Sequence, residues 1–164
     1  MSASEILIDT SLLWGLVFKN SKYRPLVLKL AQNTTLLIPK ITVLELVFAA
    51  YRSASRSGQN PQLGLQVIIE IRDFLIQFET NLTNLGVKAK WINIELEDIC
   101  KSLDYITTFG ELLKQGSKKT KWIRLFDALL LAIAHRLHVK LATSDKVIYK
   151  LAQRLNIECI LVKP

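Results

Sequence analysis

Short apolar segments alternate with longer helix-like segments along this chain, and that alternation restricts the folds it can adopt. Strands are expected at residues 5–8, 36–38, 139–143 and 157–162, with a strand or extended connection within 85–94. Helices are expected at residues 11–19, 25–32, 40–52, 65–79, 95–114 (broken near Gly110), 122–138 and 146–155, with a loop or helix break at 53–64. Strands separated by helices favour a parallel sheet, which is normally covered by helices on both faces. The sequence therefore predicts an α/β protein.

The length fits a single domain spanning residues 1–164. A domain of this size buries roughly 70% of the surface that its unfolded chain exposes, and half of the residues are hydrophobic, which argues against disorder. No internal repeat or composition change marks a second domain.

The chain is basic, with 22 Lys and Arg residues against 14 Asp and Glu and a formal charge of +8. Such an excess attracts polyanions, most often nucleic acid and sometimes an acidic membrane surface or protein. Only Cys100 and Cys159 are present, without CxxC spacing, so we expect no disulfide framework and a cytoplasmic location. No signal peptide and no stretch of 18 apolar residues is visible, so we expect no membrane association through a spanning segment.

Four acidic residues interrupt apolar surroundings. Asp9 ends Ile6-Leu7-Ile8, Glu45 and Asp127 lie among Leu, Val and Phe residues, and Asp145 follows a predicted strand. A carboxylate in such surroundings is costly to desolvate unless a cation or hydrogen bonds stabilise it.

The order of the elements predicts that these acids converge. Asp9 and Asp145 directly follow strands, and the carboxyl ends of parallel strands form the crevice where ligands bind. Glu45 lies early in the helix after the second strand, and Asp127 in the helix before Asp145. Crowded carboxylates repel one another unless a cation intervenes, and an all-oxygen set favours Mg²⁺ or Mn²⁺. With a polyanionic substrate, this combination suggests phosphodiester hydrolysis.

Each acid taken alone also has an ordinary structural explanation. Asp9 and Asp145 could cap the helices that follow them, together with neighbouring Thr and Ser residues. Asp127 could pair with Arg124 three residues earlier. Glu45 has no cationic neighbour at helical spacing, although a remote Lys or Arg could satisfy it.

The residues around the acids resemble the PIN-domain ribonucleases, which include toxins of VapBC-type toxin–antitoxin pairs. The matching segments, in the same order, are Ile6-Leu7-Ile8-Asp9-Thr10-Ser11, Val43-Leu44-Glu45-Leu46, Asp127-Ala128-Leu129-Leu130-Leu131-Ala132 and Leu141-Ala142-Thr143-Ser144-Asp145. The resemblance implies a three-layer α/β/α sandwich with a central parallel sheet, Mg²⁺- or Mn²⁺-dependent endoribonuclease activity, and frequent homodimers. No family motif was found within residues 53–121.

The resemblance also assigns roles to individual residues. Asp9, Asp127 and Asp145 would be metal ligands, and Glu45 would bind through water or position the attacking water. Thr10, Ser11 and Thr143 would orient the carboxylates.

Basic, histidine and aromatic residues outside these segments have ordinary structural explanations as well. The basic cluster of Lys118, Lys119, Lys121 and Arg124 is explained equally well as a solvated loop or as a phosphate-contacting surface. His135 and His138 favour a surface or helix-end role over a metal site. Trp14 and Trp91 are assigned to the core, and the apolar stripe 65–78 to the core and a dimer surface.

The leading hypothesis is a metal-dependent endoribonuclease that cleaves single-stranded RNA and is restrained as a toxin by an antitoxin. The alternative is a PIN-like module that binds RNA or protein without cutting, but such a module gains nothing from four crowded anions. A Rossmann-like nucleotide-binding protein would need a glycine-rich loop after the first strand, which the sequence lacks.

Overall fold

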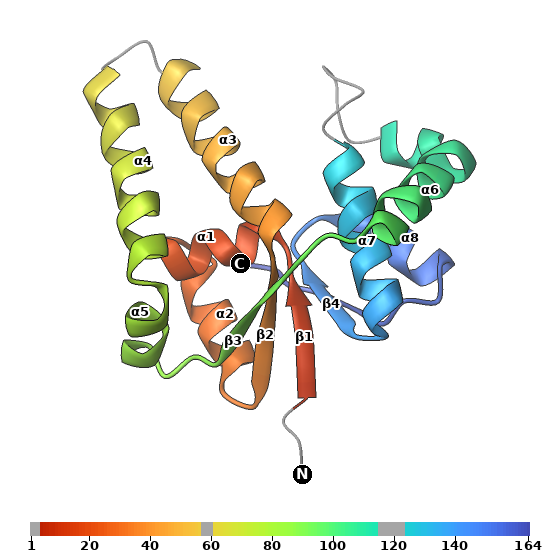
Figure 1. Ribbon diagram of the computed structural model, residues 1–164, viewed down its shortest axis with the longest axis horizontal. Coiled ribbons are helices and arrows are strands. Elements are labelled where there is room, and N and C mark those ends of the chain that lie inside the picture. Colours follow the sequence, from red (N-terminus) through yellow and green to blue (C-terminus); the bar gives the residue numbers. More distant parts are fainter. Residues whose placement is uncertain (1–3, 57–60, 115–123) are drawn as a thin grey trace.

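A computed structural model describes residues 4–56, 61–114 and 124–164, and it contains a five-stranded parallel sheet (Figure 1). The strands are β1 (Ser4–Ile8), β2 (Thr34–Pro39), β3 (Ala89–Ile92), β4 (Lys140–Thr143) and β5 (Cys159–Leu161). Their order is β3-β2-β1-β4-β5, so β1 pairs with β2 on one side and with β4 on the other. The central strand β1, from the N-terminal part of the chain, therefore lies beside β4, from the C-terminal part.

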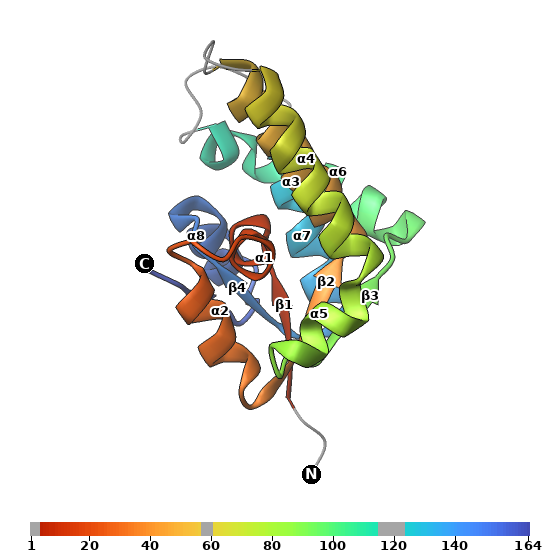
Figure 2. The same cartoon turned by 90° about the vertical axis from the view of Figure 1, so that its left-hand side faces the viewer.

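Helices cover both faces of this sheet. On one face lie α1 (Thr10–Val17), α2 (Arg24–Ala31), α3 (Lys40–Arg56), α4 (Pro61–Ile76) and α5 (Phe78–Asn84). On the other lie α6 (Leu96–Lys114), α7 (Arg124–Leu137) and α8 (Lys146–Arg154). Figure 2, turned to face the first group, shows α1, α2, α4 and α5 in front of the strands. The predicted three-layer α/β/α sandwich with a parallel sheet is confirmed.

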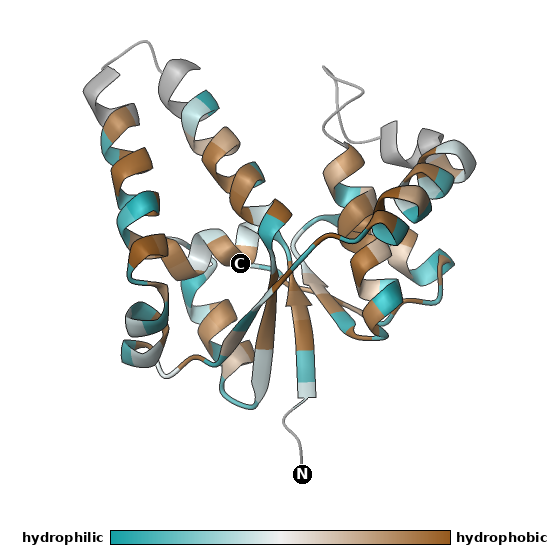
Figure 3. Cartoon of the chain, viewed as in Figure 1, coloured by the Kyte–Doolittle hydropathy of each residue, from teal (hydrophilic) through white to brown (hydrophobic). Residues whose placement is uncertain are grey.

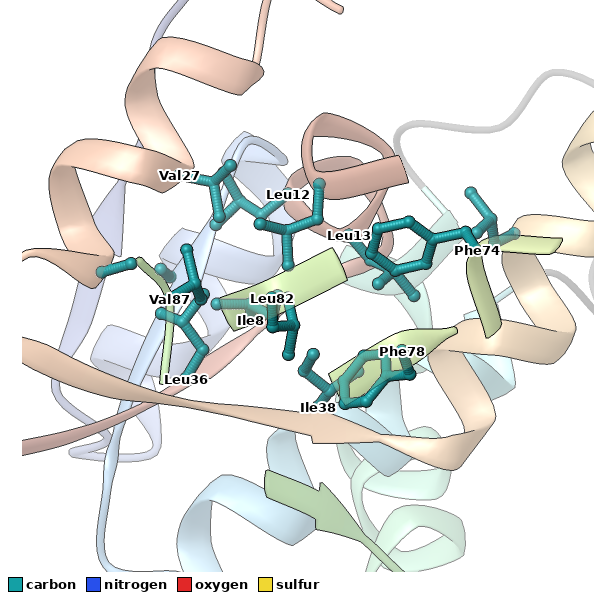
Figure 4. Close-up of a cluster of buried hydrophobic side chains, with 14 of the residues drawn as sticks. Ile8, Leu12, Leu13, Val27, Leu36, Ile38, Phe74, Phe78, Leu82 and Val87 are labelled. Atoms are coloured by element: carbon teal, nitrogen blue, oxygen red, sulfur yellow. The ribbon is translucent and has the colours of Figure 1, made fainter. Parts of the chain in front are cut away.

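Alternation along the strands divides the apolar side chains into two cores. Ile6 and Ile8 belong to the core under α1–α5, while Leu7, between them, belongs to the core under α6–α8. All three are at most 2% exposed, because the central strand is covered on both faces. Figure 4 shows the first core, in which Ile8 of β1 and Ile38 of β2 lie among side chains of the covering helices. Hydrophobic segments accordingly run through strands and helices alike (Figure 3).

Several expected element boundaries differ from those observed. The loop expected at 53–64 is shorter, because α3 continues to Arg56 and α4 already begins at Pro61, a favoured first helical residue. The helix expected at 65–79 is divided into α4 and α5. The helix break expected near Gly110 is present one residue earlier, at Phe109, whose φ of −120° and ψ of 16° are not helical.

A buried ion pair fixes α6 against α7. The Asp98 side chain is fully buried, and its two oxygens accept from Arg136 Nε at 2.8 Å and Nη2 at 2.9 Å. The backbone N–H of Glu95 donates to the same carboxylate at 2.9 Å. The hydrogen bond to Asp98 raises the pKa of Arg136 above its ordinary value. This two-point contact holds α7, which carries Asp127, in a defined position.

No helix within the described ranges is both long enough and apolar enough to cross a membrane.

Candidate active site

Asp9, Glu45, Asp127 and Asp145 line one open pocket of about 210 Å³. They arrive there from the ends of β1 and β4 and from α3 and α7, as the order of elements predicted. The remaining lining residues are Thr10, Ser11, Ile41, Thr42, Phe126, Leu130, Ser144 and Ile148. Among the described residues, the lining includes no Lys, Arg or His, so the charged groups of the pocket wall are all acidic.

Asp9 is the most enclosed of the four acids, at 6% exposure. Its Oδ1 accepts from Ser11 Oγ at 2.6 Å and from Leu12 N at 3.0 Å. Its Oδ2 accepts from Thr143 Oγ1 at 2.6 Å and from Ser144 N at 3.0 Å. The four donors compensate for the loss of water around the carboxylate and fix its orientation. Asp9 is thus the N-cap of α1, as its ordinary explanation proposed, and also part of the pocket.

Asp145 is connected to Asp9 through Thr143. The Thr143 hydroxyl, fully buried, donates to Asp9 and accepts from the backbone N–H of Asp145 at 3.0 Å. The Asp145 carboxylate caps α8 by accepting from Val147 N at 2.6 Å. A capping role therefore holds for both aspartates without removing either from the pocket.

Glu45 experiences the other acids directly. Its Oε2 accepts a hydrogen bond from Thr10 Oγ1. Burial raises the pKa of Glu45 above its ordinary value, the bond from Thr10 lowers it, and the charges of Asp9 and Asp145 raise it further. The net direction is upward, so an ionised Glu45 is disfavoured by its surroundings. A cation bound in the pocket would offset this repulsion.

Asp127 lies in the first turn of α7 and is half-buried. The expected partner Arg124 is the first residue of α7, and its side chain is outside the described part of the structure. Lys118, Lys119 and Lys121 also lie outside the described residues, so their relation to the pocket stays a prediction.

The hydroxyl groups predicted to orient the acids all donate to them. Ser11 and Thr143 donate to Asp9, and Thr10 donates to Glu45. Sequence reasoning assigned no such role to Ser144, whose backbone N–H donates to Asp9 and whose Oγ donates to Ser11 Oγ at 2.8 Å. Its position between Thr143 and Asp145, at the end of a strand, was the available signal.

The donor set fits a hard divalent cation in its chemistry, because all the acidic ligands offer oxygen. Within the described ranges, no three Asp, Glu, His or Cys side chains are already grouped closely enough to hold a metal. The hydrogen bonds of Asp9 also affect its availability to a metal ion. A carboxylate has about four lone-pair sites, and four donors already occupy them, so an ion bound to Asp9 would have to displace one. The Ser11 and Thr143 hydroxyls can rotate away, whereas the two backbone donors are fixed.

His135, Trp14 and Trp91 each make contacts with other aromatic or apolar side chains. His135 Nδ1 is hydrogen-bonded to the Tyr105 hydroxyl at 2.5 Å, which agrees with a helix-end role. Trp14 packs against the first core, and Trp91, 36% exposed, lies over Phe78 with ring centroids 4.2 Å apart.

We expect Glu45→Gln to stabilise the metal-free protein at pH 7, by on the order of 1 kcal/mol or about 2–4 °C in Tm. The raised pKa of Glu45 means that the fold disfavours the ionised side chain, so removing the charge should help above the ordinary carboxyl pKa. The gain should vanish as the pH falls below about 4, where the residue is protonated in both states. Thermal unfolding in EDTA measures this, with Glu79→Gln on the exposed surface of α5 as control. A lower Tm for Glu45→Gln at pH 7 would show that the ionised Glu45 side chain does not destabilise the metal-free protein.

Solved structures with the same fold support the topology. VapBC-1 from nontypeable Haemophilus influenzae matches with a TM-score of 0.53 and 18% identity, over 96% of this chain and 97% of that one. VapBC2 from Rickettsia felis, bound to a DNA fragment from its promoter, matches with a TM-score of 0.52 and 16% identity, over 97% of this chain and 99% of that one. A domain of a functionally unknown protein from Methanocaldococcus jannaschii matches with a TM-score of 0.52 and 18% identity, over 99% of this chain and 93% of that one. At these identities the likeness establishes the fold alone.

No curated protein has a significantly matching sequence. The sequence model of the PIN domain, in contrast, matches residues 6–154, a range that contains all four acids of the pocket. The chain therefore belongs to the PIN-domain family.

Proposed function

We propose that this protein is a metal-dependent endoribonuclease that hydrolyses phosphodiester bonds in single-stranded RNA. PIN domains are generally nucleases. The observation that carries the proposal is the pocket of about 210 Å³ that the carboxylates of Asp9, Glu45, Asp127 and Asp145 line together. A fold without a function for these charges would gain stability by losing some of them.

In this proposal Asp9, Asp127 and Asp145 hold a Mg²⁺ or Mn²⁺ ion. When bound, such an ion polarises a phosphoryl oxygen and lowers the pKa of water. The backbone N–H groups of Leu12 and Ser144, which are far apart in the sequence, fix the position of the Asp9 carboxylate. Glu45, held by Thr10, positions the attacking water and accepts its proton, a role for which a raised pKa is suitable.

The charge distribution suits an RNA substrate. The chain carries +8 overall although the pocket itself is acidic, so the attraction for phosphates must arise outside it. We assign this attraction in part to Lys118, Lys119, Lys121 and Arg124, which precede Asp127 in the sequence.

The non-catalytic alternative, a PIN-like module that binds RNA or protein, is less well supported. A binder of polyanions is weakened by an acidic pocket, because the acids repel phosphate unless a metal ion neutralises them. A Rossmann-like nucleotide site fits less well still, since Asp9 directly follows β1 where that site places glycine-rich backbone.

We further propose that the protein acts in the cytoplasm as a toxin with an antitoxin partner, and as a homodimer. Two of the structural relatives are VapBC proteins. Within the apolar stripe 65–78, Phe74 and Phe78 are buried in the core, while Leu65 and Ile76 are 60% and 73% exposed. The exposed residues are available for a dimer surface.

Purified protein should cleave single-stranded RNA when Mg²⁺ or Mn²⁺ is present, and EDTA should stop the reaction. Asp9→Asn should reduce the rate by at least about 100-fold, since it removes the charge of the most strongly held acid. Gel analysis of a labelled oligonucleotide measures both effects. Asp73→Asn, an exposed acid of α4 outside the pocket, should cleave like the unaltered protein. Cutting that survives both EDTA and Asp9→Asn would refute the proposed mechanism.

Mn²⁺ alone should raise the Tm, because a ligand that binds only the folded state stabilises it by mass action. At about 100 times the dissociation constant the gain is roughly 2.7 kcal/mol, or about 5 °C or more for a chain of this length. Asp145→Asn should lose the shift, and Asp73→Asn should keep it. An unchanged Tm at millimolar Mn²⁺ would count against the ligand assignment even if RNA were cut.

The toxin proposal predicts a short open reading frame for an antitoxin beside the gene, whose product lowers the cleavage rate when both are purified together. The dimer proposal predicts twice the monomer mass of 18.7 kDa in light scattering, reduced to the monomer by Leu65→Glu with Ile76→Glu. An active nuclease that is insensitive to the neighbouring product would leave the enzyme assignment intact and remove the toxin role.

A further inference from the structure

Helix α3 carries a row of side chains that begins in the acidic pocket and continues away from it. Ile41 and Glu45 line the pocket, and Phe48 and Arg52 follow at intervals of three and four residues. Residues at this spacing lie on the same face of a helix. The row therefore extends the pocket wall along α3, which projects beyond the ends of the strands (Figure 1).

Two aromatic side chains on this part of α3 are exposed. Phe48 is 51% exposed and Tyr51 is 59% exposed, although the opposite side of the helix buries Leu46 and Ala50 in the first core. The guanidinium carbon of Arg52 lies 4.4 Å from the centroid of the Phe48 ring. The exposed rings and the cation together offer a stacking surface one helical turn from the acids of the pocket.

We propose that Phe48 is a positioning residue that stacks on a base of the RNA next to the phosphate held in the pocket, with Tyr51 extending the platform. This inference rests on the proposed nuclease function and adds to it the residue that holds the neighbouring nucleotide. Glu45 and Phe48 are separated by about 4.5 Å along the helix axis, at 1.5 Å per residue. A base on the Phe48 ring thus lies beside the pocket and not at a remote site.

The chemistry of the surface favours nucleic acid over a protein partner. Stacking on aromatic rings is sequence-tolerant, because every base has a π-face, and the Arg52 cation adds to the attraction. The overall charge of +8 also favours a polyanion. Leu44, 63% exposed and one turn before Phe48, offers apolar area without a ring. Comparing substitutions at Leu44 and Phe48 therefore separates stacking on a ring from general apolar contact.

The test measures binding with Ca²⁺ in place of Mg²⁺ or Mn²⁺, so that a cation still neutralises the pocket acids, and a gel of each sample checks that the RNA stays intact. A single-stranded oligoribonucleotide containing 2-aminopurine reports affinity by anisotropy of an end label and stacking by quenching of the 2-aminopurine fluorescence. Phe48→Ala should weaken binding by roughly 5- to 100-fold and abolish the quenching. Phe48→Trp should retain both signals, and Leu44→Ala should match the unaltered protein. Equal Tm values for the variants establish that each is folded.

Two results would overturn the proposal. Unchanged affinity and quenching in Phe48→Ala would show that no base stacks there. Equal losses in Phe48→Ala and Leu44→Ala, without quenching in the unaltered protein, would show that the surface contributes apolar contact and that no base stacks on Phe48. Neither result touches the nuclease proposal, which stands or falls on metal-dependent cleavage and its loss in Asp9→Asn. Cleavage by the unaltered protein, together with full binding by Phe48→Ala, would reject the stacking role alone.

Discussion

The fold and the pocket depend on the same interaction, the fourfold hydrogen bonding of the Asp9 carboxylate. Two donors come from the first turn of α1, and the other two are Thr143, the last residue of β4, and Ser144, which follows it. A carboxylate at 6% exposure would be strongly destabilising without them. With them, it joins β1, α1 and the start of α8 at the point where the two central strands end. The same contacts that close the fold therefore determine the orientation of an acid in the pocket.

The same pocket lowers the stability of the fold. Burial and the charges of Asp9 and Asp145 raise the pKa of Glu45, so each carboxylate added to this space opposes the others. Elsewhere the chain neutralises a buried acid with its own partner: the bidentate contact of Asp98 with Arg136 does so between α6 and α7. Asp9, Glu45 and Asp145 instead accept hydrogen bonds from hydroxyl groups and from the backbone. That contrast is typical of a site kept for function and not for stability.

The sequence predicted the parts of the structure that depend on local pattern. The strands before Asp9 and Asp145 are predicted from their short apolar segments. The rule that parallel strands end at one edge of a sheet then predicts that the two acids lie close together. Helix lengths around residues 53–64 were not predicted, because Ser, Gly and Asn favour a turn locally while packing of α3 against α4 extends both helices. Sequence pattern also could not show which oxygen of Asp9 each donor would reach, since those donors are far apart along the chain.

The hydrogen bonds of Thr143 suggest how the pocket responds to an ion. Its hydroxyl donates to Asp9 and accepts from the backbone N–H of Asp145, so one hydroxyl lies between two of the proposed ligands. An ion that takes the Asp9 oxygen must turn this hydroxyl, or that of Ser11, away from the carboxylate. The Thr143 oxygen stays in place when only its hydroxyl hydrogen turns, so the backbone N–H of Asp145 keeps its acceptor. One buried side chain thus holds the Asp9 carboxylate and the Asp145 backbone in a fixed relation, and the Asp9 oxygen could be released to a cation without disturbing the start of α8.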